Sequence, residues 1–368
     1  MFDDKIKGKL GFGCMRLKMI DKEVDKEEFN RMIDAFMESG FNYFDTAHGY
    51  IDGKSETAIR DCLVARYKRE DFVLTDKISY WCFEKEEDII PLFEKQLECC
   101  GVEYFDFYLF HCLNREAYAK HKKCNTFEII KKLKEQGKIK HIGMSFHDTA
   151  EFLDVILTEQ PYMEAVQLQL NYLDYDDPTV QSKACYDVCV KHGKKVIVME
   201  PVKGGALADL PKEATKILKE LGDGSQASFA LRYAASYPEV FMVLSGMGNT
   251  EMMNDNIKTF KNFVPVDDRE VEALGKIREI IRKVKQLPCT KCNYCADVCP
   301  CNIPISQIFA VYNGLLGAKL SRPQAKEQLD AYREKINECI KCGKCESNCP
   351  QSIKVRDELE KISKFING

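Results

Sequence analysis

Eight short apolar runs recur along the first 250 residues of the chain, and amphipathic stretches separate them. The runs are rich in Val, Ile, Leu and Phe, which is typical of parallel strands that are buried on both faces. They predict strands at 9–13, 43–46, 72–77, 105–111, 139–145, 165–170, 195–200 and 240–246.

The stretches between these runs place apolar side chains at helical spacing. In segment 25–40, for example, Phe29, Ile33 and Phe36 fall on one face of a helix. Further helices are predicted at 55–67, 85–101, 126–138, 148–159, 180–194 and near 251–262.

Regular alternation of eight strands with helices over roughly 250 residues predicts an α/β fold, a (β/α)8 TIM barrel. A doubly wound open sheet is the alternative, and it should carry a glycine-rich dinucleotide turn after its first strand. The segment "GFGCMR" (11–16) lacks the third glycine of that turn. The segment "GYIDGKS" (49–55) is also one residue too short for a phosphate-binding loop.

A change in composition marks the end of the barrel. Segment 264–288 begins with polar residues, continues with the pattern of a long amphipathic helix and ends at Pro288. We therefore predict two domains, a barrel at 1–286 and a small, mainly α-helical domain at 287–368. The middle of this tail, 305–336, is helix-like throughout.

The tail contains two copies of one cysteine pattern, C-x2-C-x2-C-x3-C followed by proline. This spacing is that of bacterial dicluster ferredoxins, where the fourth cysteine of each run binds the other cluster. One predicted 4Fe–4S cluster has the ligands Cys289, Cys292, Cys295 and Cys349, and the other has Cys339, Cys342, Cys345 and Cys299. Zinc is the alternative metal, but its sites usually combine two well-separated cysteine pairs.

Bulk composition restricts the cellular setting. The net charge of −4 has both signs interspersed, which argues against nucleic acid as a partner. The N-terminus lacks the apolar core of a signal peptide, and no stretch approaches the about 20 apolar residues that cross a bilayer. Clustered cysteines in a reducing compartment favour metal binding over disulfides. These features predict a cytoplasmic protein without a membrane partner.

Polar side chains follow three consecutive predicted strands of the barrel. Asp45 ends the second strand and Tyr50 lies in the loop after it, Lys77 ends the third strand, and His111 ends the fourth. Active sites of such barrels lie where the strands end, at the carboxyl face. Each residue alone could have a structural role, but together they predict one site.

At these positions the sequence resembles the aldo-keto reductase superfamily, through "FDTAHGY" (44–50), "LTDK" (74–77), "YLFH" (108–111), "HIGMSFH" (141–147) and "VQLQLNY" (166–172). With "MEPVKGG" (199–205), it resembles the branch that carries a C-terminal ferredoxin-like domain. The resemblance implies the reduction or formation of a carbonyl by hydride and proton transfer. Tyr50 would then be the general acid/base, Lys77 would favour its phenolate, Asp45 would hold Lys77, and His111 would orient the substrate oxygen.

The resemblance also implies positions for a nicotinamide cofactor. Ser145 and Gln167 match residues that hold the nicotinamide amide, and Met199 stands where an aromatic residue usually stacks on the ring. Gly246 and Asn256 fall in the loop and helix that grip the adenosine end. Because Gly246, Met247 and Met252 occupy positions where other members carry basic or hydroxyl groups for a 2′-phosphate, we expect NADH rather than NADPH.

Hydride moves as an electron pair, whereas iron–sulfur clusters carry single electrons. If both parts of the chain take part in turnover, a flavin such as FMN is a further candidate cofactor, and a redox protein is a candidate partner. The alternatives are a conventional NAD(P)H carbonyl reductase with a structural or docking ferredoxin-like domain, and a redox-sensing regulatory protein. The substrate is expected to be a small carbonyl or alcohol, in a pocket lined by Met15, Tyr80, Trp81 and Cys112.

Overall fold

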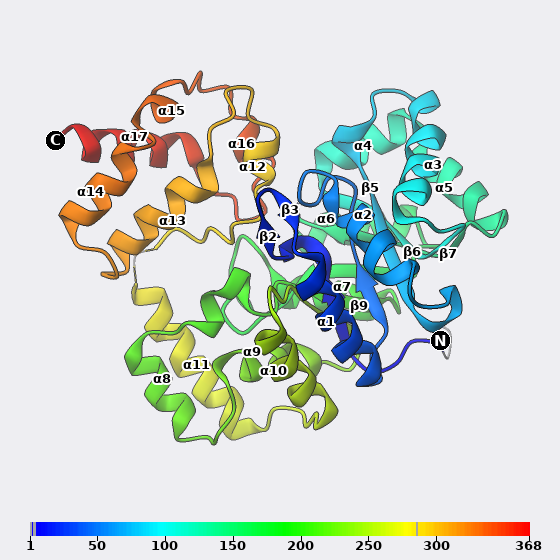
Figure 1. Cartoon of the computed structure of the whole chain (residues 1–368), viewed down its shortest axis with the longest axis horizontal. Helices are drawn as coiled ribbons and strands as arrows, with labels where there is room; N and C mark the ends of the chain where they lie inside the picture. Colours follow the sequence, from blue (N-terminus) through cyan, green and yellow to red (C-terminus); the bar gives the residue numbers. More distant parts are fainter. Residues whose placement is uncertain (1, 3–4, 285) are drawn as a thin grey trace. The chain divides into compact units, whose positions relative to one another are not determined.

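Eight parallel strands close into a barrel in a computed structural model that describes residues 2, 5–284 and 286–368 (Figure 1). Neighbours around the barrel follow the order β1-β10-β9-β8-β7-β6-β5-β4. The strands are β1 (Leu10–Gly13), β4 (Tyr43–Asp45), β5 (Val73–Ser79), β6 (Phe105–Leu113), β7 (Ile139–Phe146), β8 (Ala165–Gln169), β9 (Lys195–Met199) and β10 (Val240–Ser245). The predicted TIM barrel is confirmed, and the closed sheet excludes the open one.

Apolar side chains from alternate strand positions fill the barrel, because successive residues of a strand point to opposite faces. The interior cluster consists of Tyr43, Val73, Phe107, Leu109, Ala165, Ile197, Met242 and Leu244. Phe2 packs on this cluster, with its ring centroid 5.0 Å from that of Phe107. At Gly143 in β7, a Cβ atom would lie 2.5 Å from the carbonyl oxygen of Ala165, so only glycine fits against β8 there.

Amphipathic helices connect the strands as predicted. In α1 (Lys26–Glu38), Phe29, Ile33 and Phe36 are buried, and the Asp25 side chain accepts a hydrogen bond from the Glu28 N–H at the helix start. The other predicted helices are α2 (Lys54–Ile59) with a π turn at Arg60–Val64, α3 (Ile89–Cys100), α5 (Thr126–Glu135), α6 (Ala150–Glu159), α7 (Ser182–Lys191) and α10 (Thr250–Lys261). No helix in the described ranges is long and apolar enough to cross a membrane.

Two strands and three α-helices of the first 250 residues were not predicted. The hairpin of β2 (Met19–Ile20) and β3 (Glu23–Val24) is short, and α4 (Arg115–Lys123) is mostly polar, so neither has a clear apolar period. The helices α8 (Lys212–Lys219) and α9 (Gln226–Ala235) both lie between β9 and β10, where no helix was predicted.

The chain forms two compact units, one of residues 1–201 and 227–268 and the other of residues 202–226 and 269–368. The second unit holds α8, nearly all of α11 (Asp268–Lys283) and the helices of the tail. Residue 285, within the predicted helix 264–288, lies outside the described residues.

The tail is helical, as predicted, but segment 305–336 is three helices rather than one. They are α13 (Ile305–Leu316), α14 (Arg322–Asp330) and α15 (Arg333–Asn337). A left-handed residue at Ala318 (φ 56°) and a capping box from Ser321 separate the first two. The remaining tail helices are α12 (Tyr294–Asp297), α16 (Lys344–Ser347) and α17 (Val355–Asn367), and α12 lies beside α16 (Figure 1).

Candidate active site and cluster-binding cysteines

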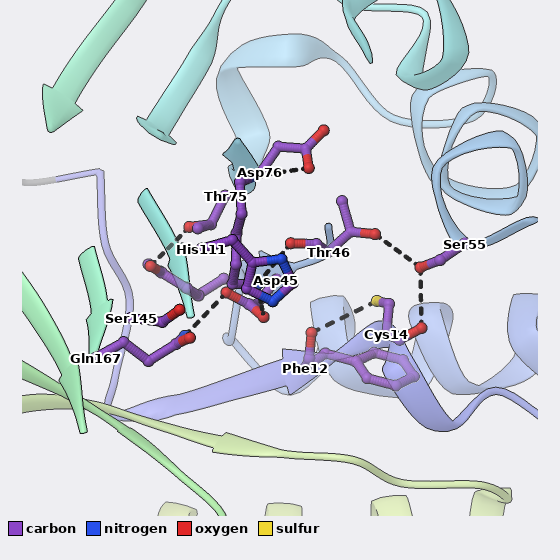
Figure 2. A network of polar contacts seen from close by, with 12 residues as sticks. Phe12, Cys14, Asp45, Thr46, Ser55, Thr75, Asp76, His111, Ser145 and Gln167 are labelled. Carbon is purple, nitrogen blue, oxygen red and sulfur yellow. Dashed lines mark hydrogen bonds and ion pairs between the residues drawn. The ribbon is translucent and has the colours of Figure 1, made fainter. Parts of the chain in front are cut away.

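A buried ion pair forms the centre of the candidate active site. The pairing of β4 with β5 brings Lys77 Nζ to 2.6 Å from Asp45 Oδ1 and 2.6 Å from the carbonyl oxygen of Thr46. Lys77 is fully buried, and Gln167 Nε2 donates to the other Asp45 oxygen at 3.2 Å (Figure 2). Burial alone would lower the pKa of Lys77, but the attraction of Asp45 and then of Tyr50 outweighs it and raises this pKa. The lysine is therefore an ammonium ion.

Tyr50 and His111 complete the group of four that the sequence predicted. Lys77 Nζ lies 4.9 Å from the centroid of the Tyr50 ring, and the His111 ring centroid lies 5.7 Å from that of Tyr50. Tyr50 is partly exposed in the turn between β4 and α2. That turn contains Ile51 (φ 56°) and Asp52 (φ 55°), two non-glycine residues in the left-handed region. Such strain is characteristic of functional loops that the surrounding fold holds in place.

His111 is buried and uncharged. Burial first, then the charge of Lys77, and then His147, lower its pKa well below the ordinary value. Its Nδ1 lies 2.6 Å from Ser79 Oγ, which fixes the ring. A neutral imidazole can hydrogen-bond a substrate oxygen but supplies no positive charge. Trp81, a predicted pocket residue, places its ring centroid 5.1 Å from that of His111.

The residues predicted to hold a nicotinamide lie on the neighbouring strands. Ser145 on β7 pairs in register with Gln167 on β8, and both side chains are buried. Ser145 Oγ accepts a hydrogen bond of 2.8 Å from the N–H of Cys112, whose φ is 52°. Met199 ends β9 and is partly buried. Gln167 also bonds Asp45, so it adjoins the group of Asp45, Tyr50, Lys77 and His111, while the role of these positions toward a cofactor stays a prediction.

The predicted adenosine positions lie at the end of β10 and on α10. Asn256 is buried and donates to Ser245 Oγ at 2.6 Å, and Gly246 is exposed. Arg16, which sequence reasoning missed, lies beside this loop, because a Cβ at Gly246 would be 3.1 Å from Arg16 Cδ. Only the pairing of β1 with β10 brings the two segments together, and that pairing is a property of the closed barrel.

Glu28 is a second residue that the sequence pattern did not single out. Its Oε1 accepts hydrogen bonds from the N–H of Thr250 at 2.6 Å and from its hydroxyl at 2.9 Å, at the first residue of α10. The Arg31 guanidinium and then Thr250 lower the pKa of Glu28 to about 2. The Glu28 carboxylate is therefore ionised, paired with Arg31, and lies at the N-terminus of α10, where the helix dipole favours anions.

Behind the Lys77 strand lies a buried group of Glu56, Asp76 and Cys100. Their ligand-type atoms lie within 4.8 Å of one another, and Glu56 Oε2 is 2.9 Å from Nδ1 of His48, in the loop that precedes Tyr50. Burial raises the pKa of Glu56 to about 7, and burial followed by the Glu56 charge raises that of Asp76 well above its ordinary value. Two carboxyl groups this close cannot both ionise cheaply, so the pair holds a proton near neutral pH.

The eight motif cysteines gather around two cavities. One cavity is lined by Cys289, Cys292, Cys295 and Cys349, and the other by Cys299, Cys339, Cys342 and Cys345, together with Cys301. The grouping is the one expected if each fourth cysteine binds the other cluster. Four motif thiols on each cavity suit an iron–sulfur cubane, and assignment of each thiol as a ligand stays a prediction.

The two runs also repeat each other's backbone at an interval of 50 residues. Left-handed residues occur at Lys291 and Lys341, just before the second cysteine of each run. They recur directly after it, at Asn293 and Gly343, where the short helices α12 and α16 begin. Successive turns of this kind point backbone N–H groups into one concavity, which suits an anionic cluster.

Comparisons with known protein families agree with this geometry. Residues 9–279 match the model of the aldo/keto reductase family, and residues 285–353 match that of a 4Fe-4S dicluster domain. The chain belongs to the aldo/keto reductase family. This aldo/keto reductase is an oxidoreductase with a 4Fe-4S dicluster domain after its barrel.

Individual proteins show the same likeness. The uncharacterized oxidoreductase YqkF of Bacillus subtilis is 23% identical over 297 residues, which cover 72% of this chain and 90% of that protein. The glyoxal reductase of the same organism is 25% identical and covers 68% and 84%. Among solved structures, the holo form of an aldo-keto reductase from Bacillus halodurans has a TM-score of 0.60 at 24% identity, covering 73% and 91%. An aldo/keto reductase from Klebsiella pneumoniae in complex with NADP and acetate has 0.60 at 19%, covering 73% and 90%. These two structures share the fold.

We predict that Glu56→Gln reduces the pH dependence of barrel stability. A carboxyl whose pKa is raised on folding favours the folded state fully below its unfolded value of 4.5, and this advantage is lost as pH rises through about 7. The loss amounts to at most roughly 3 kcal/mol. Because glutamine does not ionise, the variant should lose less stability than the wild type between pH 5 and pH 8.

Chemical denaturation followed by the fluorescence of Trp81, the chain's one tryptophan, measures this difference. Glu116→Gln, at an exposed position of α4, is the matched control and should follow the wild type. Parallel pH profiles for the wild type and Glu56→Gln would contradict the assignment of a buried proton to this pair.

Proposed function

We propose that this aldo/keto reductase interconverts a small carbonyl compound and its alcohol, with Tyr50 as the general acid/base. The observation that carries the proposal is the convergence of Tyr50, Lys77, Asp45 and His111 at the carboxyl ends of three neighbouring strands. A bound nicotinamide would supply the hydride, and Ser145 and Gln167 are the polar groups offered to its amide. The chain's own residues would position the substrate and supply the electrostatic field around it.

The proton reaches the substrate oxygen from the Tyr50 hydroxyl. The Lys77 ammonium favours the phenolate that remains, because opposite charges at short range in a water-poor site attract strongly. Asp45 and the Thr46 carbonyl hold the ammonium in place, so no reorganisation is needed as charge develops. Neutral His111 orients the carbonyl oxygen toward Tyr50 by a hydrogen bond.

We further propose that the cofactor is NADH. Gly246, Met247 and Met252 offer a 2′-phosphate neither a basic nor a hydroxyl side chain. Glu28 adds a reason, because its carboxylate already occupies donors at the N-terminus of α10 and would repel a second anion. Arg16 beside Gly246 is suited to the pyrophosphate, which both dinucleotides carry, and does not separate them.

In this proposal the chain has two domains, 1–286 and 287–368, and the cysteine-rich second domain would carry single electrons through two 4Fe–4S clusters. Nicotinamides exchange electron pairs, so coupling the clusters to the barrel needs a group that stores one electron. A flavin such as FMN has this property. Position 199, where an aromatic residue usually stacks on the nicotinamide ring, is a methionine, so a bound cofactor ring would make a different contact there. Electrons would then enter or leave through a redox partner protein.

Tyr50→Phe is expected to lower kcat for carbonyl reduction at least about 100-fold, because phenylalanine has no proton to donate. Binding of nicotinamide, measured by fluorescence titration, should change little, since the ring is retained. Tyr104→Phe, which keeps the ring stacked under Arg69, is the control and should retain full activity. Unchanged turnover in Tyr50→Phe would refute the assigned role and favour a regulatory function.

Glu28→Gln should shift cofactor preference toward NADPH. Glutamine keeps an acceptor for Thr250 but removes the charge, so the ratio of the NADPH and NADH dissociation constants should fall about two- to fivefold. Isothermal calorimetry measures both constants. The exposed neighbour Glu27 provides the control, and Glu27→Gln should leave the ratio unchanged. Tighter binding of NADPH than NADH by the wild type would overturn the NADH proposal itself.

Protein purified without oxygen should contain about eight iron atoms per chain if both clusters are present. Metal analysis and the absorption spectrum test this number and the flavin together. A flavin envelope beside the cluster band supports coupled electron transfer through the barrel. Zinc in place of iron contradicts the cluster assignment, and iron without flavin leaves the conventional nicotinamide reductase as the supported function.

A further inference from the structure

The two cluster sites repeat each other in backbone but differ in what covers them. In the site of Cys289, the residue after the first cysteine is Thr290, which is only 2% exposed. Its counterpart 50 residues on is Ile340, which is 66% exposed. The two cavities therefore offer their clusters different environments, although the ligand spacing is identical.

The covering segment is the "KGG" of the motif "MEPVKGG", which the catalytic group does not use. Gly204 has φ 62°, and a Cβ there would lie 2.6 Å from the carbonyl oxygen of Thr290 and 2.8 Å from its Cα. Only glycine lets the two backbones approach this closely. Segment 203–208 is therefore fitted against the loop between Cys289 and Cys292.

Lys203, the residue before this glycine, brings a positive charge to the same site. It is 6% exposed, and its Nζ donates a hydrogen bond of 2.5 Å to Gln351 Oε1. Gln351 is buried in turn and lines the cavity together with Cys289, Cys292, Cys295 and Cys349. Lys203 also has a left-handed φ of 49°, a conformation that a lysine adopts only when its surroundings fix it.

The repeated site lacks an equivalent buried cation among the described residues that line it. The counterpart of Gln351 is Cys301, whose carbonyl oxygen lies 3.5 Å from Nζ of Lys335, a lysine with 46% of its side chain exposed. Arg356 lines that cavity, but it is exposed and paired with Glu346 at 2.7 Å. Water screens exposed charges far more than buried ones, so these two act weakly on a cluster.

A cluster held by four thiolates carries net negative charge, and its one-electron reduction adds one more. A nearby buried cation stabilises the reduced form more than the oxidised form and so raises the reduction potential. We propose that Lys203 raises the reduction potential of the cluster held by Cys289, Cys292, Cys295 and Cys349, with Gly204 and Gln351 as its positioning residues. The proposal rests on the two-cluster assignment and is independent of carbonyl reduction.

Replacing Lys203 by methionine tests it, because methionine keeps the length of the side chain but not the charge. The readout is a potentiometric titration with dithionite, followed by the EPR signals of the two reduced clusters in the full-length protein. In Lys203→Met, one midpoint potential should move to a more negative value while the other stays in place. Lys203→Arg retains the charge and should restore the wild-type potential.

Lys335→Met, at the repeated position, is the matched control and should leave both potentials unchanged. Two unchanged potentials in a fully loaded Lys203→Met protein would overturn the proposal, as would equal shifts of both clusters. If Lys203→Met fails to hold iron, Lys203→Gln answers the question, because it removes the charge, keeps a hydrogen-bond donor for Gln351 and should shift the same potential negatively. Wild-type protein with fewer than two clusters would instead refute the cluster assignment.

Discussion

The buried pair of Lys77 and Asp45 is the constraint around which the barrel's site is arranged. Removing two charges from water is costly, and the cost is offset only when geometry and further hydrogen bonds are favourable. Here the carbonyl of Thr46, the residue after Asp45, and the Gln167 amide on β8 provide those bonds. Loss of either partner would leave a buried charge uncompensated, which typically costs about 3–5 kcal/mol. The strands that supply these four groups are therefore fixed relative to one another.

Several properties of the neighbouring residues follow from this charge. Burial and, second to it, the charge of Lys77 keep His111 neutral, so the imidazole is available as a hydrogen-bonding group. In the proposed reaction, the ammonium would also attract the Tyr50 oxygen as it becomes anionic. On the far side of the same strand, Asp76 and Glu56 retain a proton because a second uncompensated anion there would be too costly. The charge of Lys77 thus adds to burial in keeping His111 neutral, whereas burial and the Glu56 charge raise the pKa of Asp76 against the effect of Lys77.

The sequence predicted this architecture well where a local pattern encodes it. Eight apolar runs fixed the barrel, and polar residues at their ends located Asp45, Lys77 and His111, because parallel strands end on a common face. The cysteine spacing likewise predicted which thiols share a cavity. Arg16, Glu28 and Lys203 were missed for a common reason. Each meets its partner through a tertiary contact between segments distant in sequence, and no periodicity or spacing records such a contact.

Both parts of the chain face the same electrostatic problem. In the proposed functions, a phenolate forming on Tyr50 and an electron entering a thiolate-ligated cluster would each add negative charge to the protein. In each place a buried lysine lies close by, Lys77 beside Tyr50 and Lys203 beside the cysteine cavity. The partners differ, since Asp45 is charged and Gln351 is an amide. The field of Lys77 is partly cancelled by Asp45, which also keeps the lysine ionised. An amide carries no net charge, so in the proposed arrangement Gln351 positions Lys203 without offsetting its charge.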